Sequence, residues 1–145
     1  MDVISFSIDG VTTFAGSYGS FEAMLDSFKA DIICLQKIKI SREKLKKEMV
    51  LLNKYYSFIH CCSSKLANSG VATFCKKDKS TPVDASLGFT LPNYKDIDYE
   101  GRFLLTDHGS FLVMNIYFPV SGRLDKISYK MWFFYVVQEL SLIHI

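Results

Sequence analysis

A short apolar run constrains the fold of this chain more than any other feature. Residues 32–35 read Ile-Ile-Cys-Leu and follow directly after Asp31. A run of this kind is typical of a strand that is buried on both faces, whereas a strand with one solvated face alternates between apolar and polar residues. The sequence therefore predicts a central strand that other layers cover on both sides.

The pattern around this strand predicts alternating strands and helices. Apolar residues at positions 21, 24, 25 and 28 fall on one face of a helix whose N-cap is Ser17 or Ser20. Helices are also expected over 41–52 and 124–140, with mostly loop over 63–69 and 80–98. Further strands are expected over 3–8, 56–61, 71–75, 102–107 and 111–117, the last two forming a hairpin through 108–110. This order predicts an α/β fold with a mixed sheet.

The composition excludes several classes of protein. The chain has 145 residues, of which 49% are hydrophobic and 22% charged, and its formal net charge is +2. The 12 Phe and 8 Tyr favour a collapsed chain over intrinsic disorder, and the length favours one domain. The net charge is too small to indicate nucleic-acid binding by itself.

The sequence contains no motif for secretion, membrane insertion or metal binding by cysteine. Its start lacks a basic region, and its most apolar stretch, 131–145, is shorter than the roughly 20 residues that a membrane span needs. We therefore expect a soluble intracellular protein with no membrane partner. The 4 cysteines form no CxxC pair, so we expect them to be buried, reduced thiols that pack as small apolar residues.

Five sequence blocks occur in the order seen in one known family. They resemble the opening strand SWNINGI, the strand DIICLQETK, the strand SGVATFCK, the hairpin start EGR and the motif NVYxP of the exonuclease III and apurinic/apyrimidinic (AP) endonuclease family. The matching residues are 5–10, 31–39, 69–76, 100–102 and 115–119. The third block resembles the AP endonuclease 2 branch in particular. Retrotransposon endonucleases share the outline but match this block poorly.

This resemblance implies a fold and an activity. The family fold is a four-layer α/β sandwich, in which two mixed sheets pack together and helices cover them on the outside. Its members hydrolyse DNA phosphodiester bonds beside abasic sites or at 3′ ends during base-excision repair, using Mg²⁺ or Mn²⁺ held by oxygen ligands. The resemblance therefore implies DNA as a partner, a divalent metal as a cofactor and a nuclear location.

Several residues stand where the family has functional side chains. Asp9 resembles the Asp or Asn beside the metal, at a place where Asp before Gly also favours a turn. Ser7 stands where an Asn of the family helps to hold the metal. Lys39 matches a lysine that organises the site and its phosphate. Tyr117 matches the tyrosine that contacts the scissile phosphate, or else it is a core aromatic. Arg123 stands where the family presents a polar residue to DNA, or else it is an exposed loop arginine.

Lys37 is the largest departure from the family pattern, because it stands where the family has its metal-binding Glu. Glu attracts Mg²⁺ and Lys repels it. Unit charges about 4 Å apart interact by about 4 kcal/mol at an effective dielectric constant near 20, and a divalent ion doubles this energy. Two roles are open to Lys37. Its ammonium group takes the place of the cation and binds phosphate, or its side chain points to solvent in an inactive site, which is the role we expect.

A basic run and two further departures bear on DNA binding. Val120 replaces the polar residue that follows the family proline, and Asn68 stands where a Tyr usually precedes the third block. A run of basic residues either tracks phosphates or forms the solvated face of an amphipathic helix, and we expect the second. The run consists of Lys37, Lys39, Arg42, Lys44, Lys46 and Lys47.

The later motifs of the family, GDLN and SDH, do not occur in this sequence. We therefore expect residues 1–140 to be a partial family domain without its C-terminal half, and 141–145 to be an atypical tail. Half a sandwich is expected to expose one sheet face, which a protein partner would cover. The expected function is that of a divergent, truncated AP endonuclease or 3′-exonuclease that is inactive alone. The alternatives are a non-catalytic DNA-binding module and a fragment of a retrotransposon-type endonuclease.

Overall fold

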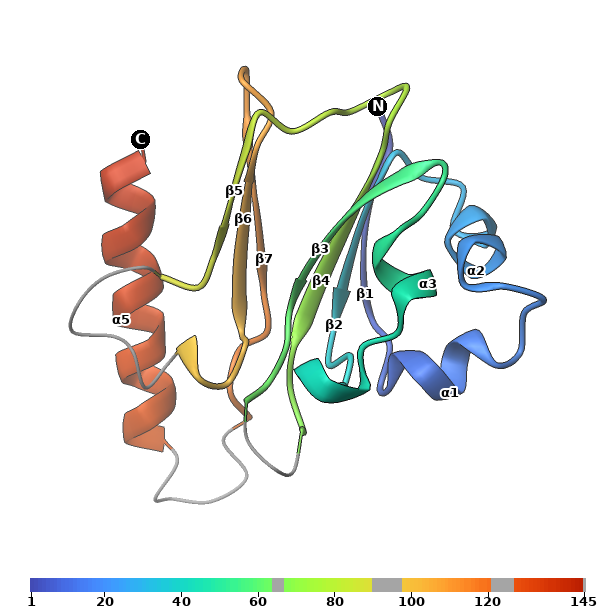
Figure 1. Ribbon diagram of the computed structural model, residues 1–145. Coiled ribbons are helices and arrows are strands. Elements are labelled where there is room, and N and C mark those ends of the chain that lie inside the picture. The colour runs from blue at the N-terminus through green and yellow to red at the C-terminus, as the bar shows by residue number, and fades with distance from the viewer. Residues whose placement is uncertain (64–66, 90–97, 121–126, 145) are drawn as a thin grey trace.

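The computed structural model describes residues 1–63, 67–89, 98–120 and 127–144, with backbone only for 143 and 144 (Figure 1). Within these ranges, seven strands and several helices follow one another. The strands are β1 (Val3–Ser7), β2 (Ile32–Gln36), β3 (Tyr55–His60), β4 (Val71–Lys76), β5 (Asp84–Leu87), β6 (Phe103–Asp107) and β7 (Leu112–Ile116). The helices are α1 (Val11–Ala15), α2 (Phe21–Ser27), the 3₁₀ turn η1 (Arg42–Lys44), α3 (Lys47–Val50) and α5 (Ile127–His144).

The first sheet has the strand order β1-β2-β4-β3. Strands β1 and β2 are parallel, and the other neighbours are antiparallel, so this sheet is mixed. All five residues of β2 are buried, which confirms the prediction of a strand covered on both faces. Helix α2 begins after Ser20, whose hydroxyl accepts a hydrogen bond from the amide of Ala23 at 3.1 Å, as expected of an N-cap.

The second sheet is antiparallel, with the order β5-β6-β7. Strands β6 and β7 pair antiparallel and form the hairpin that the sequence predicts. Strand β5 lies inside the segment that we expected to be mostly loop, and that expectation is wrong for Asp84–Leu87. Its sequence, Asp-Ala-Ser-Leu, alternates polar and apolar residues over only four positions and contains no β-branched or aromatic residue, and the strand forms because its backbone pairs with β6 at the edge of the sheet. Pairing at an edge overrides a weak intrinsic preference for strand.

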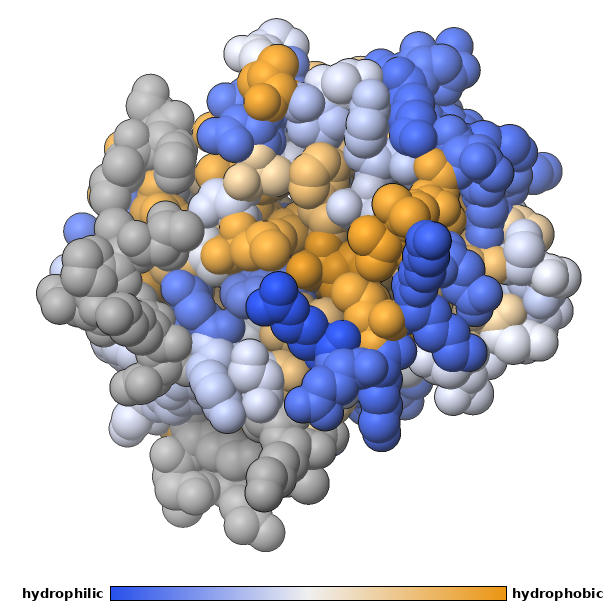
Figure 2. All heavy atoms as spheres, in the orientation of Figure 1, coloured by the Kyte–Doolittle hydropathy of each residue, from blue (hydrophilic) through white to orange (hydrophobic). Residues whose placement is uncertain are grey.

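The molecule has four layers, and their order is visible in Figure 1. Helices α1 to α3 cover one face of the first sheet, the second sheet packs on its other face, and α5 covers the outer face of the second sheet. The expected fold class, an α/β sandwich with helices on the outside, is confirmed. On the face shown in Figure 2, apolar residues gather across the centre, over the region where β3 and β5 run in Figure 1.

The helices expected over 41–52 and 124–140 differ in their bounds from the helices of the structure. The expected helix over 41–52 is wrong as one unit, because Leu45 and Lys46 are extended and divide it into η1 and α3. Leu45 packs against the first core, and this contact overrides the helix preference of the segment. The last helix is described from Ile127 and continues to His144, so residues 141–144 of the expected tail extend it. Residues 124–126 lie outside the described part.

Most of each sheet has a layer on both sides, so the expectation of an uncovered sheet face is wrong for the described residues except at β1. Two apolar cores fill the space beside the sheets. The first lies under α1 to α3 and includes Met24, Leu25, Ile33, Leu35 and Phe74. The second lies under α5 and includes Phe89, Phe103, Phe133, Val136 and Leu140. What remains open is the edge strand β1, in which four of five residues are exposed.

A buried amide network joins the two sheets. The side chain of Gln36 in β2 donates to Oδ1 of Asn115 in β7 at 2.8 Å and to the hydroxyl of Ser5 in β1 at 3.0 Å. The amide nitrogen of Asn115 donates to the Ala72 carbonyl at 2.8 Å and lies 3.2 Å from the Thr73 hydroxyl. Because Asn115 is 2% exposed, these bonds form out of water, and losing one partner leaves the others buried and unsatisfied.

The substitution Asn115→Ala is expected to lower the free energy of unfolding by about 1–3 kcal/mol, because it leaves buried partners in β2 and β4 unpaired. Urea denaturation followed by circular dichroism measures this loss. The exposed Asn53 provides a matched control, and Asn53→Ala is expected to change the stability by less than about 0.5 kcal/mol. Equal effects of the two substitutions would contradict a structural role for the network.

The cysteines are free thiols, as expected, and three of them are buried. Cys34 and Cys75 lie with Ile32 between the two sheets, and burial raises their pKa values to about 11 and about 12. Cys61 is the half-buried one.

No helix among the described residues is both long and apolar enough to span a membrane.

Alkylation of the native protein at neutral pH is expected to modify Cys61 first and to leave Cys34 and Cys75 intact until the chain unfolds. The physical reason is that a thiol reacts as its thiolate, which burial disfavours. Mass spectrometry of peptides after timed iodoacetamide treatment, with and without denaturant, measures the order. Rapid modification of Cys34 in the native state would show that the sheets separate readily.

Candidate functional site

The segment after β2 places two lysines at the end of the first sheet. In the sequence Lys37-Ile38-Lys39-Ile40, both isoleucines are buried in the first core, with exposed fractions of 2% and 3%. Lys37 is half-buried and Lys39 is exposed. Burial of the two isoleucines therefore fixes the backbone from which the lysines extend.

Backbone hydrogen bonds hold this segment between its neighbours on both sides. The amide of Gly10 donates to the carbonyl of Lys37 at 2.9 Å, and the amide of Lys39 donates to the carbonyl of Ser69 at 3.0 Å. The amide of Ile38 donates to the carbonyl of Gly70 at 3.2 Å. A Cβ atom on Gly70, which has a φ of 102°, would lie 2.8 Å from Cγ1 of Ile38. Position 70 therefore requires glycine for both its conformation and its space.

Three residues of the site adopt the left-handed backbone conformation that side chains disfavour. The φ angles are 49° at Asp9, 58° at Lys37 and 51° at Lys39. Each costs about 1–2 kcal/mol relative to a right-handed conformation. Residues in such conformations cluster at functional sites, where the surrounding structure holds them in place. Here the hydrogen bonds to Gly10 and Ser69 hold them.

Asp9 binds both lysines through the same oxygen atom. Its Oδ1 lies 2.9 Å from Nζ of Lys37 and 2.7 Å from Nζ of Lys39. The side chains of the lysines are 33% and 37% exposed, and that of Asp9 is 63% exposed. Hydrogen bonds from Lys39 and Lys37 lower the pKa of Asp9 to about 2, and the Asp9 carboxylate raises the pKa of Lys37. The cluster therefore carries two positive charges and one negative charge at neutral pH.

A cavity of about 420 Å³ opens beside this cluster. Lys37, Lys39 and Arg102 are the cationic residues of its wall, and Tyr117 and Asn68 also line it. The remaining lining residues are Glu100, Pro119, Val120 and Tyr129. We call this cavity the lysine pocket. It gathers side chains from the ends of β2 and β7, from the residues before β4 and β6, and from α5.

Arg102 organises the side of the lysine pocket opposite the lysines. Its Nε atom pairs with a carboxylate oxygen of Glu100, and its Nη1 atom donates to the carbonyl of Tyr117 at 3.2 Å. The guanidinium carbon lies 4.9 Å from the centre of the Tyr117 ring, a distance at which a cation and an aromatic face attract each other. Arg102 thereby fixes the orientation of Tyr117.

The hydroxyl of Tyr129 lies in the pocket wall without a hydrogen bond of normal geometry to any described residue. The oxygen atom is buried, and this burial, together with the negative charge of Glu100, raises the pKa of Tyr129 to about 12. Glu100 and Arg102 are the polar neighbours of this hydroxyl.

The structure brings together four of the residues that the sequence singled out. Asp9, Lys37 and Lys39 form the charged cluster, and Tyr117 lines the adjacent lysine pocket. Tyr117 is half-buried, so its ring is not the fully buried core aromatic of the alternative interpretation. Ser7 pairs with Gln36 in the sheet and does not line the pocket. Arg123 lies outside the described residues.

The expectation that Lys37 points to solvent is wrong. Its ammonium group pairs with Asp9 at 2.9 Å, because the backbone turn at residue 37 directs the side chain back toward the end of β1. The expectation that the basic run forms one solvated helix face is also wrong. Lys37 and Lys39 precede η1 and turn toward Asp9, whereas Lys44 and Lys47 belong to two separate short helices.

Residues present at the site do not fit a divalent metal. Mg²⁺ binds oxygen atoms at about 2.0–2.1 Å in octahedral geometry and repels cations. Around Asp9, the neighbours within hydrogen-bond distance are two ammonium groups rather than a second carboxylate. In the part of the chain that the structure describes, no group of three or more His, Cys, Asp or Glu side chains is placed to share a metal.

Sequence reasoning gave no role to Arg102, Glu100 and Tyr129. Arg102 and Glu100 lie in the quoted block 100–102, so a signal existed for them, although nothing in the block indicated the contact with Tyr117. Tyr129 lies in α5, far along the chain, and no local pattern places its hydroxyl in the lysine pocket. Only the packing of α5 against the second sheet does so.

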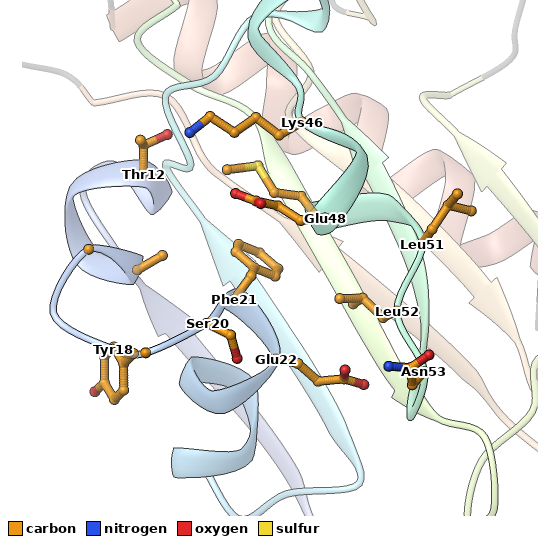
Figure 3. A pocket seen from close by; sticks show the side chains of 14 residues that line it. Thr12, Tyr18, Ser20, Phe21, Glu22, Lys46, Glu48, Leu51, Leu52 and Asn53 are labelled. Atoms are coloured by element: carbon orange, nitrogen blue, oxygen red, sulfur yellow. The ribbon is translucent and has the colours of Figure 1, made fainter.

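A second cavity, of about 590 Å³, lies on the helix-covered side between the α1–α2 region and α3 (Figure 3). Apolar side chains of Phe21, Met49 and Leu52 share its lining with Lys46 and Glu48. None of the predicted site residues lines it. It is therefore distinct from the lysine pocket and is not the candidate site.

The fold and the site define the class of the protein, a four-layer α/β sandwich with a cationic pocket at the strand ends. Its sequence is 32% identical to DNA-(apurinic or apyrimidinic site) endonuclease 2 of Homo sapiens, over 79% of this chain and 28% of that protein. It is 30% identical to the enzyme of the same name from Xenopus laevis, over 95% of this chain and 32% of that protein. No protein-family model matches the chain.

Solved structures agree with these sequence relatives. The catalytic domain of AP endonuclease 2 from Xenopus laevis matches with a TM-score of 0.81 and 28% identity, over 95% of this chain and 52% of that domain. An AP endonuclease from Leishmania major matches with a TM-score of 0.76 and 25% identity, over 96% of this chain and 47% of that protein. The chain belongs to the exonuclease III and AP endonuclease family, which confirms the predicted resemblance. It spans about a third or less of those curated relatives and about half of those structures.

The ion pairs of Asp9 predict how its carboxyl group titrates. In the folded protein we expect a midpoint at about 2, below the ordinary value of 3.8, because both ammonium groups favour the charged form. A lowered pKa stabilises the fold above the unfolded value, and this contribution is lost as the pH falls from 3.8 toward 2. Carbon-13 NMR of the Asp9 side chain measures the midpoint.

The matched variants for this titration are Lys39→Met and Lys79→Met. The first removes the ammonium group nearest Asp9 and is expected to raise the midpoint toward 3.8. The second removes an exposed lysine beyond the other end of β4 and is expected to leave the midpoint unchanged. A wild-type midpoint near 3.8 would mean that the ion pairs do not form in solution.

Proposed function

We propose that this chain binds DNA by its phosphate backbone at an abasic site or a 3′ end, as a divergent AP endonuclease-like or 3′-exonuclease-like protein of base-excision repair. The observation that carries the proposal is the lysine pocket, where Lys37, Lys39, Arg102 and Tyr117 converge. Ammonium and guanidinium groups are the usual protein ligands of phosphate oxygens. A role in DNA repair places the protein in the nucleus.

The charge of the pocket supports an anionic ligand. Asp9 neutralises one of its two lysines, and Glu100 neutralises Arg102. One positive charge remains, which matches the single negative charge of a phosphodiester group. The Tyr117 side chain and the amide of Asn68 add polar groups around the same space, and these groups can orient the phosphate that the lysines attract.

The proposal includes binding without hydrolysis by this chain alone. Attack on a phosphodiester needs a group that positions or deprotonates water and a group that stabilises the developing charge. Glu100 lines the lysine pocket and Asp9 pairs with its two lysines, and each of these carboxylates is held by a cation. A carboxylate engaged in this way is a poor base. The relatives are named as endonucleases, but the chain spans only part of them.

DNA binding tests the first half of the proposal. We expect a labelled duplex with an abasic-site analogue to bind the chain with an affinity that falls as salt increases, because binding releases counterions from phosphates. Lys39→Ala is expected to weaken binding about tenfold, or about 1.4 kcal/mol, and to reduce the salt slope by about one. Fluorescence anisotropy over a series of salt concentrations measures both quantities.

Lys79→Ala serves as the control for Lys39→Ala, since it removes the same charge beyond the opposite end of β4. It is expected to bind DNA as the wild type does. Equal losses in the two variants would indicate a diffuse electrostatic attraction rather than a site. No binding by folded protein at low salt would refute the proposal, and cleavage of the labelled strand by this chain would refute its second half.

A further inference from the structure

We infer that the ammonium group of Lys37 replaces a divalent cation at this site, so that a DNA phosphate binds in the lysine pocket without any metal ion. This inference rests on the proposed function and specifies how the phosphate is held. It follows from a disagreement between the residues present and the metal that the family resemblance implies.

The ammonium group of Lys37 occupies the side of Asp9 where a metal ion would bind. Nζ of Lys37 and Nζ of Lys39 both lie within hydrogen-bond distance of the same oxygen of Asp9, at 2.9 and 2.7 Å. A metal ion that approached this oxygen would meet both ammonium groups at close range. Repulsion by two like charges, together with the loss of two ion pairs, opposes its binding. The resemblance assigns Asp9 to the metal, but Oδ1 of Asp9 is already paired with the ammonium groups of Lys37 and Lys39.

The total charge of the cluster suits a phosphate without a metal ion. In the arrangement that the resemblance implies, an Asp, a Glu, a Lys and a divalent ion together carry a single positive charge. Asp9, Lys37 and Lys39 carry the same single positive charge with no metal present. The change from Glu to Lys at position 37 therefore preserves the electrostatic attraction for a phosphate, although it removes the metal ligand.

The backbone places the two lysines before any ligand binds. Lys37 and Lys39 both have left-handed φ angles, and hydrogen bonds to Gly10 and Ser69 hold the two residues in place. The side chains are about one-third exposed, so they are neither free in solvent nor sealed in the core. Binding of an anion to such side chains loses less conformational entropy than binding to freely moving lysines.

The two lysines retain unused hydrogen-bond donors. An ammonium group has three donors, and one donor of each lysine suffices for Asp9. The remaining donors are available to phosphate oxygens in the cavity of about 420 Å³ that Lys37 and Lys39 line.

The experiment compares DNA binding in excess EDTA with binding in millimolar MgCl₂ at constant ionic strength. The wild-type chain is expected to bind the labelled abasic duplex with affinities that differ by less than about twofold between the two conditions. Lys37→Glu is expected to weaken binding at least about tenfold in EDTA and to recover part of this loss in MgCl₂, because it recreates a pair of carboxylates with Asp9.

Mn²⁺ binding followed by electron paramagnetic resonance gives a readout that does not depend on DNA. The wild-type chain is expected to leave Mn²⁺ free in solution, and Lys37→Glu is expected to bind it. Lys37→Gln is the second variant, which removes the charge without creating a metal ligand. It is expected to weaken DNA binding in both conditions and to leave Mn²⁺ free. Lys79→Glu is the matched charge reversal outside the pocket, and it is expected to behave as the wild type with both probes.

The outcomes separate this inference from the proposed function. Wild-type binding that EDTA abolishes, or Mn²⁺ bound by the wild type, would overturn the inference and leave DNA binding by the family site intact. Folded wild-type protein that binds no DNA in either condition would overturn the proposed function itself. A loss in Lys79→Glu as large as that in Lys37→Glu would overturn the assignment to Lys37. Circular dichroism establishes the fold of each variant.

Discussion

The buried contact between Gln36 and Asn115 is the interaction on which the rest of this structure depends. It joins β2 of the first sheet to β7 of the second at 2.8 Å, in an interior that is otherwise mostly apolar. Apolar contacts between sheets tolerate sliding, whereas a satisfied amide pair has one geometry. Because Gln36 directly precedes Lys37 and Asn115 lies two residues before Tyr117, this pair also sets the relative position of the two walls of the lysine pocket.

Apolar burial then determines where the charges lie. Ile38 and Ile40 enter the first core, and the backbone between them takes left-handed turns at Lys37 and Lys39. The two lysines meet Asp9 for this reason and not because of their own attraction to it, since exposed ion pairs contribute little to stability. The site is a consequence of packing. The ion pairs select one arrangement of side chains on a backbone that the isoleucines have already fixed.

Much of the fold could be predicted from apolar patterns, and the site only in part. The run 32–35 predicted β2 because complete burial requires a continuous apolar sequence. Strand β5 was missed because its alternation covers only four residues, none of them β-branched or aromatic, and its pairing with β6 makes it a strand. Family blocks located Asp9, Lys39 and Tyr117 in the sequence. They could not show that Lys37 turns toward Asp9, because its direction depends on the φ angle at residue 37 and on hydrogen bonds from distant segments.

The exchange of Glu for Lys separates two tasks that a metal performs together. A divalent ion attracts phosphate by its charge, and it also offers directed coordination positions that activate water and polarise the bond under attack. The ammonium group of Lys37 supplies charge and hydrogen-bond donors but no such positions. The inference about Lys37 therefore means that the cluster of Asp9, Lys37 and Lys39 would attract a DNA phosphate without supplying the means of cutting it. On that inference, one residue separates binding from catalysis in this fold.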